Sequence, residues 1–386
     1  MTRFWLGGYG ADMEGSADGI GLLAGGDDHP GRERAPIRSL GYRGAVAPAP
    51  SPSWLAAHPS LDVVYAALEG AGEVRAFRRN GDTGLSSFGE PLAAGAAVCH
   101  LAVSPRGDAL VASCYGDGRV VRFGLGPDGA LIAPAADRAQ RAAAVRAALL
   151  GEGPDASADT ARPADPHPAA DPYAADPDRL DPNGDPRVTH AHAAAFLPDG
   201  RIATTDLGFD LVRFWRPGAD GGLVPDHEVV LPRGTGPRHM VVHPSGHLHV
   251  VTEYSCEVFT LAAGPDGRWS IAAATTATPL AQIGSDYPAE LARSRDGATL
   301  YTALRGSNTI AALRVRGDGG TVEPLALAES GVDWPRHHLV HEGALLVAGQ
   351  RSDEVAILDL DERTGAPGRV LHRAPAPTPT VILPVR

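Results

Sequence analysis

Histidine, arginine and carboxylate side chains recur at equivalent places in a repeat of about 47 residues. The clearest copy reads Gly236-Pro237-Arg238-His239, with a turn at His243-Pro244-Ser245-Gly246. At the position of His239, successive copies carry Trp54, His100, His192, His239, Glu290 and His337. Imidazole and carboxylate groups exchange protons with substrates, and guanidinium groups bind carboxylate or phosphate. We therefore expect one site built from several repeats.

A second set of residues follows about 14 positions later, where the next strand is expected to end. Its members are Glu69, Tyr115, Asp206 with Leu207, Glu253, Arg305 and Gln350 with Arg351, joined by Tyr9 near the N-terminus. Antiparallel strands joined by a turn bring the start of one beside the end of the next, so both sets are expected at one rim. Arg238 and Arg336 add positive charge there, which predicts a basic funnel suited to a small anion.

Several of these residues also have a structural interpretation. A histidine in a repeat signature commonly bonds a neighbouring loop carbonyl and holds blades together, which applies to His100, His239 and His337. Arg336 and Arg351 are equally consistent with surface ion pairs.

Glu253 and Arg305 end strands that are otherwise apolar. A charge there is costly without a polar cavity or a partner, and pairing with each other is one alternative. The His190-x-His192 pair with Glu253 resembles a metal site of two histidines and a carboxylate, but no third ligand has diagnostic spacing. We therefore predict no metal.

A period of this length made of short strands is typical of a β-propeller, in which four-stranded blades bury their faces against each other. Apolar runs such as Val63–Ala67 and Thr299–Ala303 indicate one strand of each blade, and runs such as Arg119–Phe123 indicate the next. Gly-containing turns, among them Gly116-Asp117-Gly118, separate these strands. The sequence therefore predicts an all-β fold.

The two ends of the chain complete the ring in this interpretation. Arg3–Gly7 and Gly19–Leu23 lack a partner strand, which Thr380–Val385 can supply. Such pairing closes the ring and removes an exposed sheet edge. We expect a seven-bladed propeller of four-stranded blades, forming a single domain over residues 1–386.

Residues 137–187 interrupt the period between the third and fourth blades. The first part, Asp137–Leu150, is rich in alanine with arginine at helical spacing and predicts a short helix capped at Gly151. The remainder, Gly153–Pro186, is dense in proline and aspartate and predicts a loop. Two interpretations of this insertion remain, namely a lid over the funnel and a solvated loop without a function.

Composition excludes several classes of function. The formal net charge of −12 disfavours nonspecific binding of nucleic acid. No apolar run approaches the roughly 18 residues that span a membrane, and no charged-then-apolar leader follows Met1, so a cytoplasmic location is expected. All 34 basic residues are arginine, which excludes Schiff-base and lysine-nucleophile chemistry. The odd number of cysteines, Cys99, Cys114 and Cys256, predicts buried thiols.

At these motifs the chain resembles the seven-bladed β-propeller lactonase family, which includes propeller-type 6-phosphogluconolactonase and the fungal 3-carboxy-cis,cis-muconate lactonizing enzyme. The motifs are Leu6-Gly7-Gly8-Tyr9 with Gly19-Ile20, Cys99-His100-Leu101, His190-Ala191-His192, Asp206-Leu207-Gly208, Gly236-Pro237-Arg238-His239, Pro288-Ala289-Glu290-Leu291 and Pro335-Arg336-His337. By the family's pattern, His192, Arg238, Glu253 and Arg305 match positions proposed to act in catalysis.

The resemblance implies hydrolysis of a small anionic sugar lactone, similar to 6-phosphogluconolactone, without a cofactor. Glu253 or His192 would activate water, and Arg238 or Arg305 would stabilise the oxyanion. The residues expected to bind substrate are His190, His239, Glu290, Arg336, His337 and Gln350. Two alternatives remain, namely a cycloisomerase that adds a carboxylate across a muconate double bond and a non-catalytic propeller that binds partners.

Overall fold

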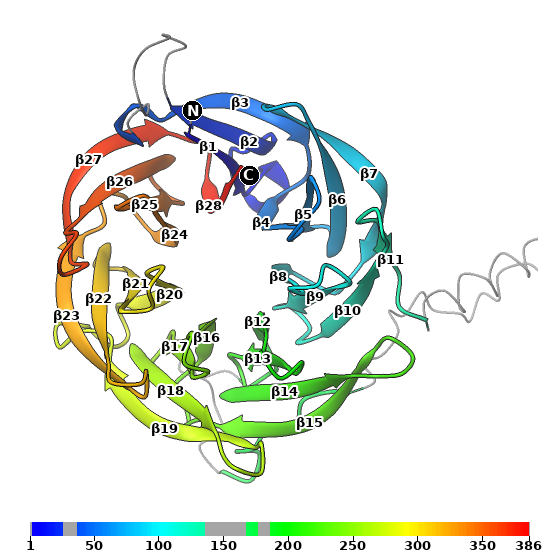
Figure 1. Ribbon diagram of the computed structural model, residues 1–386, viewed down its shortest axis with the longest axis vertical. Coiled ribbons are helices and arrows are strands. Elements are labelled where there is room, and N and C mark those ends of the chain that lie inside the picture. The colour runs from blue at the N-terminus through cyan, green and yellow to red at the C-terminus, as the bar shows by residue number, and fades with distance from the viewer. Residues whose placement is uncertain (1, 26–36, 136–166, 177–185, 386) are drawn as a thin grey trace, which may run out of the picture.

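Seven four-stranded antiparallel sheets surround a central axis, which confirms the predicted propeller (Figure 1). The computed structural model describes residues 2–25, 37–135, 167–176 and 186–385. Blades are numbered here in chain order. The helix expected over Asp137–Leu150, with its cap at Gly151, lies outside the described residues.

Each blade is given from its innermost strand outward. The first contains β28 (Pro379–Pro384), β1 (Thr2–Gly8), β2 (Gly19–Gly25) and β3 (Gly41–Pro48). The second contains β4 (Pro52–Ala57), β5 (Val63–Leu68), β6 (Glu73–Asn80) and β7 (Gly84–Ala93). The third contains β8 (Val98–Val103), β9 (Ala109–Cys114), β10 (Val120–Leu125) and β11 (Leu131–Ile132). The fourth contains β12 (Ala191–Phe196), β13 (Ile202–Asp206), β14 (Leu211–Pro217) and β15 (Leu223–Val230).

The remaining three blades follow the same order. The fifth contains β16 (Pro237–Val242), β17 (Leu248–Thr252), β18 (Glu257–Ala263) and β19 (Trp269–Thr276). The sixth contains β20 (Tyr287–Arg293), β21 (Thr299–Arg305), β22 (Thr309–Arg316) and β23 (Thr321–Glu329). The seventh contains β24 (Pro335–His341), β25 (Ala344–Gly349), β26 (Glu354–Leu360) and β27 (Pro367–Pro375).

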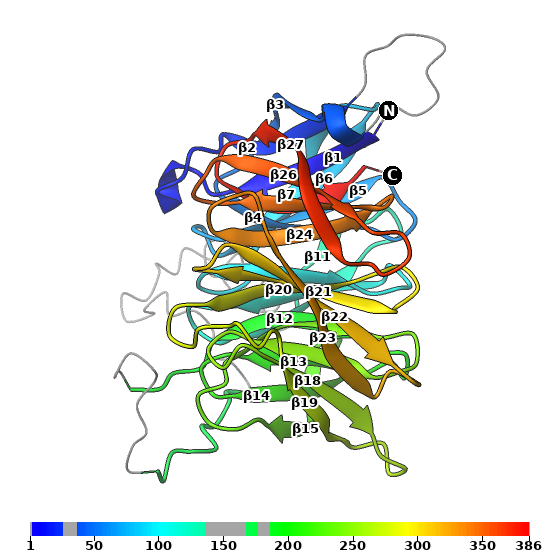
Figure 2. The same cartoon turned by 90° about the vertical axis from the view of Figure 1, so that its left-hand side faces the viewer.

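The ring closes in the first blade, where the last strand of the chain pairs with the first. Strand β28 lies antiparallel to β1, with Trp5 opposite Leu383 and Leu6 opposite Ile382. Figure 2 shows the two ends of the chain close together on one side of the ring. This pairing confirms the predicted closure and leaves β1 without a free edge.

Apolar side chains fill the spaces between neighbouring blades. Strands β5 and β9 are buried along their whole length, because each lies inside its sheet and both of its faces pack on adjacent blades. Tyr65, Leu110 and Phe123, for example, belong to one cluster that joins the second and third blades. This packing explains why these strands are continuous apolar runs in the sequence.

A β-bulge near the start of each inner strand sets the direction of the functional side chains. In the fifth blade, Pro237 lies opposite Thr252 and His239 opposite Val251, which leaves Arg238 as the extra residue. In the seventh blade, Pro335 and His337 flank the extra residue Arg336 in the same way. A bulge re-aims a side chain, and here it presents arginine to the axis.

The insertion lies between β11 and β12, and its described residues contact the fourth and fifth blades. The hydroxyl of Tyr173 donates a hydrogen bond of 2.7 Å to the carbonyl of Leu231. Arg187 forms ion pairs with Asp171 at 3.3 Å and Asp210 at 2.7 Å. Segment 167–176 is therefore held against the chain around Asp210 and Leu231. No helix in the described ranges is long and apolar enough to cross a membrane.

Candidate functional site

A small cavity lies on the axis, where the inner strands of the blades meet. It has room for about one water molecule. Its lining residues come from all seven blades and are Ser53, Trp54, Glu69, Cys99, His192, Arg238, His239, Glu290, Arg336 and Thr380. The fold therefore brings distant parts of the sequence to one polar point, as the repeat predicts.

Glu253 lies beside this cavity and receives two guanidinium groups. Its Oε2 atom is 2.7 Å from Arg238 Nε and 2.9 Å from Arg305 Nη2. Arg305 also donates to the carbonyl of Tyr287 at 3.0 Å and lies 5.3 Å from the ring of Trp334. Glu253 and Arg305 therefore pair with each other, which is one of the alternatives that the sequence leaves open, and Arg238 joins the pair.

The charges of this triad persist at neutral pH. Burial raises the pKa of Glu253, but Arg305 and Arg238 outweigh burial and leave that pKa below its ordinary value. Burial and the charge of Arg305 lower the pKa of Arg238 to about 10, which still leaves it protonated. The triad therefore carries one net positive charge, held where water is largely excluded.

His192 occupies the position of Arg238, not that of His239 as the sequence alignment places it. Ala191 lies opposite Asp206 and Ala194 opposite Thr204, so His192 falls in the bulge of the fourth blade. The sequence prediction is wrong by one residue, because it matches residues by type. The spacing to the turn glycine, the same from Ala193 to Gly200 as from His239 to Gly246, instead places Ala193 at the position of His239.

The imidazole of His192 is buried and neutral. Burial, followed by the charges of Arg238 and Arg336, lowers its pKa well below the ordinary value. Its Nδ1 atom has no hydrogen-bond partner among the described residues. His192 therefore offers a nitrogen to a molecule in the cavity.

Arg336 forms another part of the cavity wall. Its guanidinium lies 5.1 Å from the ring centroid of Tyr9, and Nη1 donates to Gln350 Oε1 at 3.3 Å. The hydroxyl of Tyr9 in turn lies 3.2 Å from both carboxylate oxygens of Glu69. Gln350 thus holds Arg336, and together with Arg238 and Arg305 this residue gives the site three guanidinium groups.

Trp54 and three histidines from different blades form a layer of aromatic rings beside the cavity. The ring centroid of Trp54 lies 4.4 Å from that of His100, 5.7 Å from that of His239 and 5.4 Å from that of His337. Each of these imidazoles is buried, and burial is the main cause that lowers each pKa below its ordinary value. The layer is therefore uncharged at neutral pH, and its close packing limits the access of water to the axis.

The histidines of this layer bridge blades, which supports the structural interpretation. Their Nδ1 atoms accept backbone N–H groups from the next blade, namely Ala194 for His100, Leu291 for His239 and Ile382 for His337, at 3.3 to 3.4 Å. The partner is an amide and not the expected carbonyl. His337 is therefore better described as a bridging residue than as a substrate ligand, whereas His239 also lines the cavity.

Glu290 combines a cavity position with a bridging contact. Its Oε2 atom accepts the backbone N–H of His338 at 2.9 Å and lies 3.2 Å from His337 Nε2. Burial raises the pKa of Glu290 to about 8, so the carboxyl is largely protonated at neutral pH. An uncharged carboxyl leaves the positive charge of the neighbouring Arg238 and Arg336 uncompensated.

His190 does not lie in the axial cavity. Its Nδ1 is 2.6 Å from the carbonyl of Tyr115, and its ring stacks on the ring of Tyr115 at 4.1 Å. It lines a separate side cavity with Arg187, Asp210 and Tyr254. His190 comes just before β12 and two positions before His192, the extra residue of the bulge.

Cys99 also lines the cavity, together with Ser53 and Thr380, and the sequence assigns none of the three a place in the site. Their signal is positional, since they occupy the same place in the repeat as Arg238 and Arg336. All three cysteines are buried free thiols, and burial raises the pKa of Cys99 to about 12. In the part of the chain that the structure describes, no group of three or more His, Cys, Asp or Glu side chains is placed to hold a metal ion.

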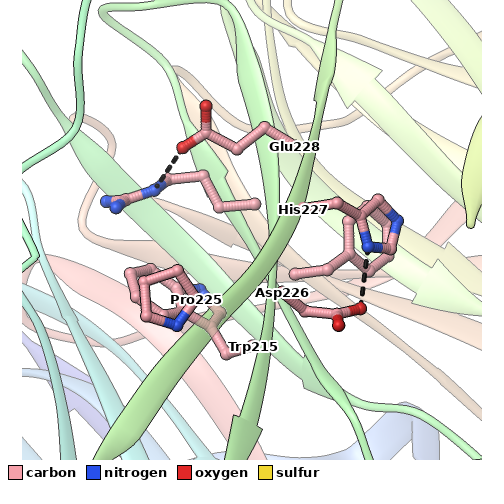
Figure 3. A pocket seen from close by; sticks show the side chains of 7 residues that line it. Trp215, Pro225, Asp226, His227 and Glu228 are labelled. Atoms are coloured by element: carbon pink, nitrogen blue, oxygen red, sulfur yellow. Dashed lines mark hydrogen bonds and ion pairs between the residues drawn. The ribbon is translucent and has the colours of Figure 1, made fainter.

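A second hollow lies on the outer strands of the fourth blade (Figure 3). There Arg213 pairs with Glu228 at 3.2 Å, and His227 pairs with Asp226 at 2.8 Å. The other nitrogen of His227 accepts the backbone N–H of Trp269. These groups already satisfy one another, so the axial cavity is the better candidate site.

Comparison with known proteins identifies the family and agrees with the fold. The sequence profile of a family described as "Lactonase, 7-bladed beta-propeller" matches residues 38–384. The chain is 24% identical over 323 residues to 6-phosphogluconolactonase of Bacillus subtilis, which covers 82% of each chain. A solved protein from Lactobacillus plantarum superposes with a TM-score of 0.77 at 20% identity, covering 100% of both chains. The periplasmic gluconolactonase of Pseudomonas aeruginosa gives 0.74 at 21% identity, covering 100% of this chain and 99% of that one.

Proposed function

This chain belongs to the seven-bladed β-propeller lactonase family, and from that premise we propose that it hydrolyses a small anionic sugar lactone at the axial site, against the residues that line the small cavity. The observation that carries the proposal is the buried pair Arg238 and Arg305 on one carboxylate oxygen of Glu253, close to a neutral imidazole. Fixed positive charge in a site that excludes water stabilises a developing oxyanion.

His192 is the general base in this proposal. Its Nδ1 is unpartnered and its imidazole is neutral, so the ring can accept a proton from water. Glu253 is less suited to this step, because Arg238 and Arg305 engage its Oε2 atom and lower its pKa. Glu253 instead holds the two guanidinium groups in place.

The reaction then follows from these roles. The oxygen of water bonds to the lactone carbonyl carbon, its proton moves to His192, and the carbonyl oxygen becomes an oxyanion beside Arg238 and Arg305. The tetrahedral intermediate collapses, the ring C–O bond breaks, and His192 returns the proton to the leaving oxygen. The product is the open hydroxy acid, and no cofactor takes part.

Arg336 supplies the contact for the phosphate or carboxylate of the substrate. Its guanidinium lies near the ring of Tyr9 and donates a hydrogen bond to Gln350, and both of these partners are uncharged. Its positive charge is therefore left for the substrate. Arginine presents a planar fork that matches phosphate and carboxylate. A phosphorylated aldonolactone, of the 6-phosphogluconolactone type, has both the carbonyl and the anionic group that this arrangement requires.

A substrate panel tests the proposal. The purified protein is incubated with 6-phosphogluconolactone, with uncharged glucono-1,5-lactone and with 3-carboxy-cis,cis-muconate, and proton release and NMR spectra follow the ring-opening or ring-closing reaction. We expect the phosphorylated lactone to open fastest relative to its spontaneous rate. Ring closure of the muconate without lactone hydrolysis would show a cycloisomerase, and no turnover of any compound would favour a binding propeller.

A further inference from the structure

The tautomer of His239 is determined by a single backbone contact. The amide N–H of Leu291, in strand β20, points at His239 Nδ1 with an N···N distance of 3.3 Å. An amide nitrogen can only donate, so Nδ1 must be the acceptor. A neutral imidazole has one acceptor and one donor nitrogen, and the proton of His239 therefore resides on Nε2.

Protonation of this imidazole at its second nitrogen is unfavourable. Added at Nδ1, a proton would face the N–H of Leu291 directly. Burial, His100 and Arg238 also lower the pKa of His239 well below its ordinary value. The ring therefore stays neutral, and its Nε2–H group remains a donor.

The Nε2–H group of His239 is a buried donor without an acceptor among the described residues. His337 has the same backbone contact in the seventh blade, yet its Nε2 lies 3.2 Å from Glu290 Oε2. The repeat thus supplies a carboxyl near this nitrogen in one blade and none in the other. Leaving a buried donor unpaired is costly, which indicates that a ligand atom or water pairs with it when the site is occupied.

The Nε2–H donor of His239 lies beside the positive charge of Arg238. His239 and Arg238 are adjacent in β16, and the bulge allows both to line the cavity. One contributes a neutral N–H donor and the other a positive charge. Donors of both kinds, fixed before the reaction begins, are the components of an oxyanion hole.

We infer that His239 is a further catalytic residue, which donates its Nε2–H to the carbonyl oxygen of the lactone as that oxygen becomes negatively charged. This inference rests on the proposed lactone hydrolysis. When water adds, the π electrons of the carbonyl move to its oxygen, and the Nε2–H and the guanidinium of Arg238 stabilise that charge. The electrons return when the ring C–O bond breaks, and His239 keeps its proton throughout.

Two substitutions separate this role from the bridging role of the same residue. In His239→Asn the amide oxygen can replace Nδ1 as acceptor for Leu291, while the donor at Nε2 is lost. In His239→Gln the longer amide can return a donor near Nε2, while the bridge is lost. His100→Asn is the matched control, because His100 makes the same bridging contact, to Ala194, but does not line the cavity.

We expect H239N to lower kcat by about 100-fold with KM changed less than about threefold, at a melting temperature near that of the wild type. H239Q should recover part of kcat despite lower stability, and H100N should keep kcat within about threefold. Retention of full kcat by H239N, or equal losses of kcat in H239N and H239Q that follow their losses of stability, would overturn the inference.

A spectroscopic measurement makes the test independent of turnover. In protein labelled with 15N-histidine, the resonances missing from H239N identify His239, and we expect the Nε2–H tautomer from pH 6 to 8. Addition of 6-phosphogluconate, whose carboxylate stands in for the opened lactone, should shift the Nε2–H resonance. A protonated ring or the Nδ1–H tautomer would overturn the inference even if the enzyme hydrolyses lactones. Absence of any lactone hydrolysis by the wild type would instead defeat the proposed function.

Discussion

Arg305 Nη2 lies 2.9 Å from Glu253 Oε2 across the boundary between the fifth and sixth blades. Because Arg238 reaches the same oxygen from within the fifth blade, one carboxylate fixes two cations in a small space. Such a cluster is stable only if its charges balance or if an anion joins it. The ion pair between Glu253 and Arg305 therefore joins two blades and also positions the arginines that are proposed to stabilise the oxyanion.

Replacing Glu253 by glutamine leaves Arg238 and Arg305 without the carboxylate that holds them. We expect kcat for lactone hydrolysis to fall at least about 100-fold, because the oxyanion donors lose their positions. Urea unfolding should also show a loss of stability. The control is Glu323→Gln, which breaks an exposed ion pair with Arg316 and should change the free energy of unfolding by less than about 1 kcal/mol. An E253Q rate equal to that of the wild type would rule out this role.

Replacing His192 by alanine removes the proposed base and should lower kcat at least about 100-fold. The lowered pKa of His192 also predicts the pH profile. A base acts in its unprotonated form, and a lowered pKa keeps it in that form at lower pH, so wild-type kcat/KM should stay flat from pH 8 to 6. A steep decline of kcat/KM through pH 6.5, after subtraction of spontaneous hydrolysis, would indicate an unshifted histidine.

Arg336 is expected to recognise the anionic group of the substrate. In Arg336→Gln the KM for 6-phosphogluconolactone should rise at least about tenfold, while the KM for uncharged glucono-1,5-lactone should change little. Arg106→Gln provides the comparison, since the side chain of Arg106 is largely exposed and pairs with Asp108. Equal effects of R336Q on both lactones would contradict a charge-specific contact.

His249, which does not line the axial cavity, predicts an acid-dependent loss of stability. Burial, followed by His243 and His247, lowers the pKa of this residue to about 3, and its Nδ1 bonds Thr260 Oγ1 at 3.1 Å. A folded-state pKa below the unfolded value stabilises the fold above that value, about pH 6.5, and the contribution is lost as pH falls toward 3. At pH 5 the loss should be on the order of 2 kcal/mol.

Denaturant unfolding of wild type and His249→Phe at pH 7.5 and pH 5 measures this contribution. The phenylalanine cannot be protonated, so the variant should lose less stability than the wild type over the same interval. Identical pH dependence in the two proteins would show that His249 does not titrate in the unfolding transition.

The repeat in the sequence was sufficient to predict the propeller and its closure, because the period and the apolar strands report the blade directly. It also placed Arg238 at the start of an inner strand and Glu253 and Arg305 at the ends of the strands that follow, all at one rim. The position of His192 was one residue out, because the prediction matched histidine by type, whereas the spacing to the turn glycine Gly200 places Ala193 opposite Thr205 in the register of the other copies.

The roles of the other histidines depend on contacts between blades that no local pattern encodes. His100, His239 and His337 occupy the same place in the repeat and make the same backbone contact, yet only His239 among them lines the cavity. His190 looks similar to His192 in sequence but stacks on Tyr115 outside the axis. These differences follow from which side chains face each residue across a blade boundary.

The most direct measurement compares kcat/KM for 6-phosphogluconolactone in the wild-type protein and in Arg238→Gln. The axial site predicts a wild-type value of at least about 10⁴ M⁻¹ s⁻¹ and a variant value at least about 100-fold lower. Ring opening at the spontaneous rate with the wild type, or undiminished catalysis by R238Q, would contradict hydrolysis at the axis of the propeller.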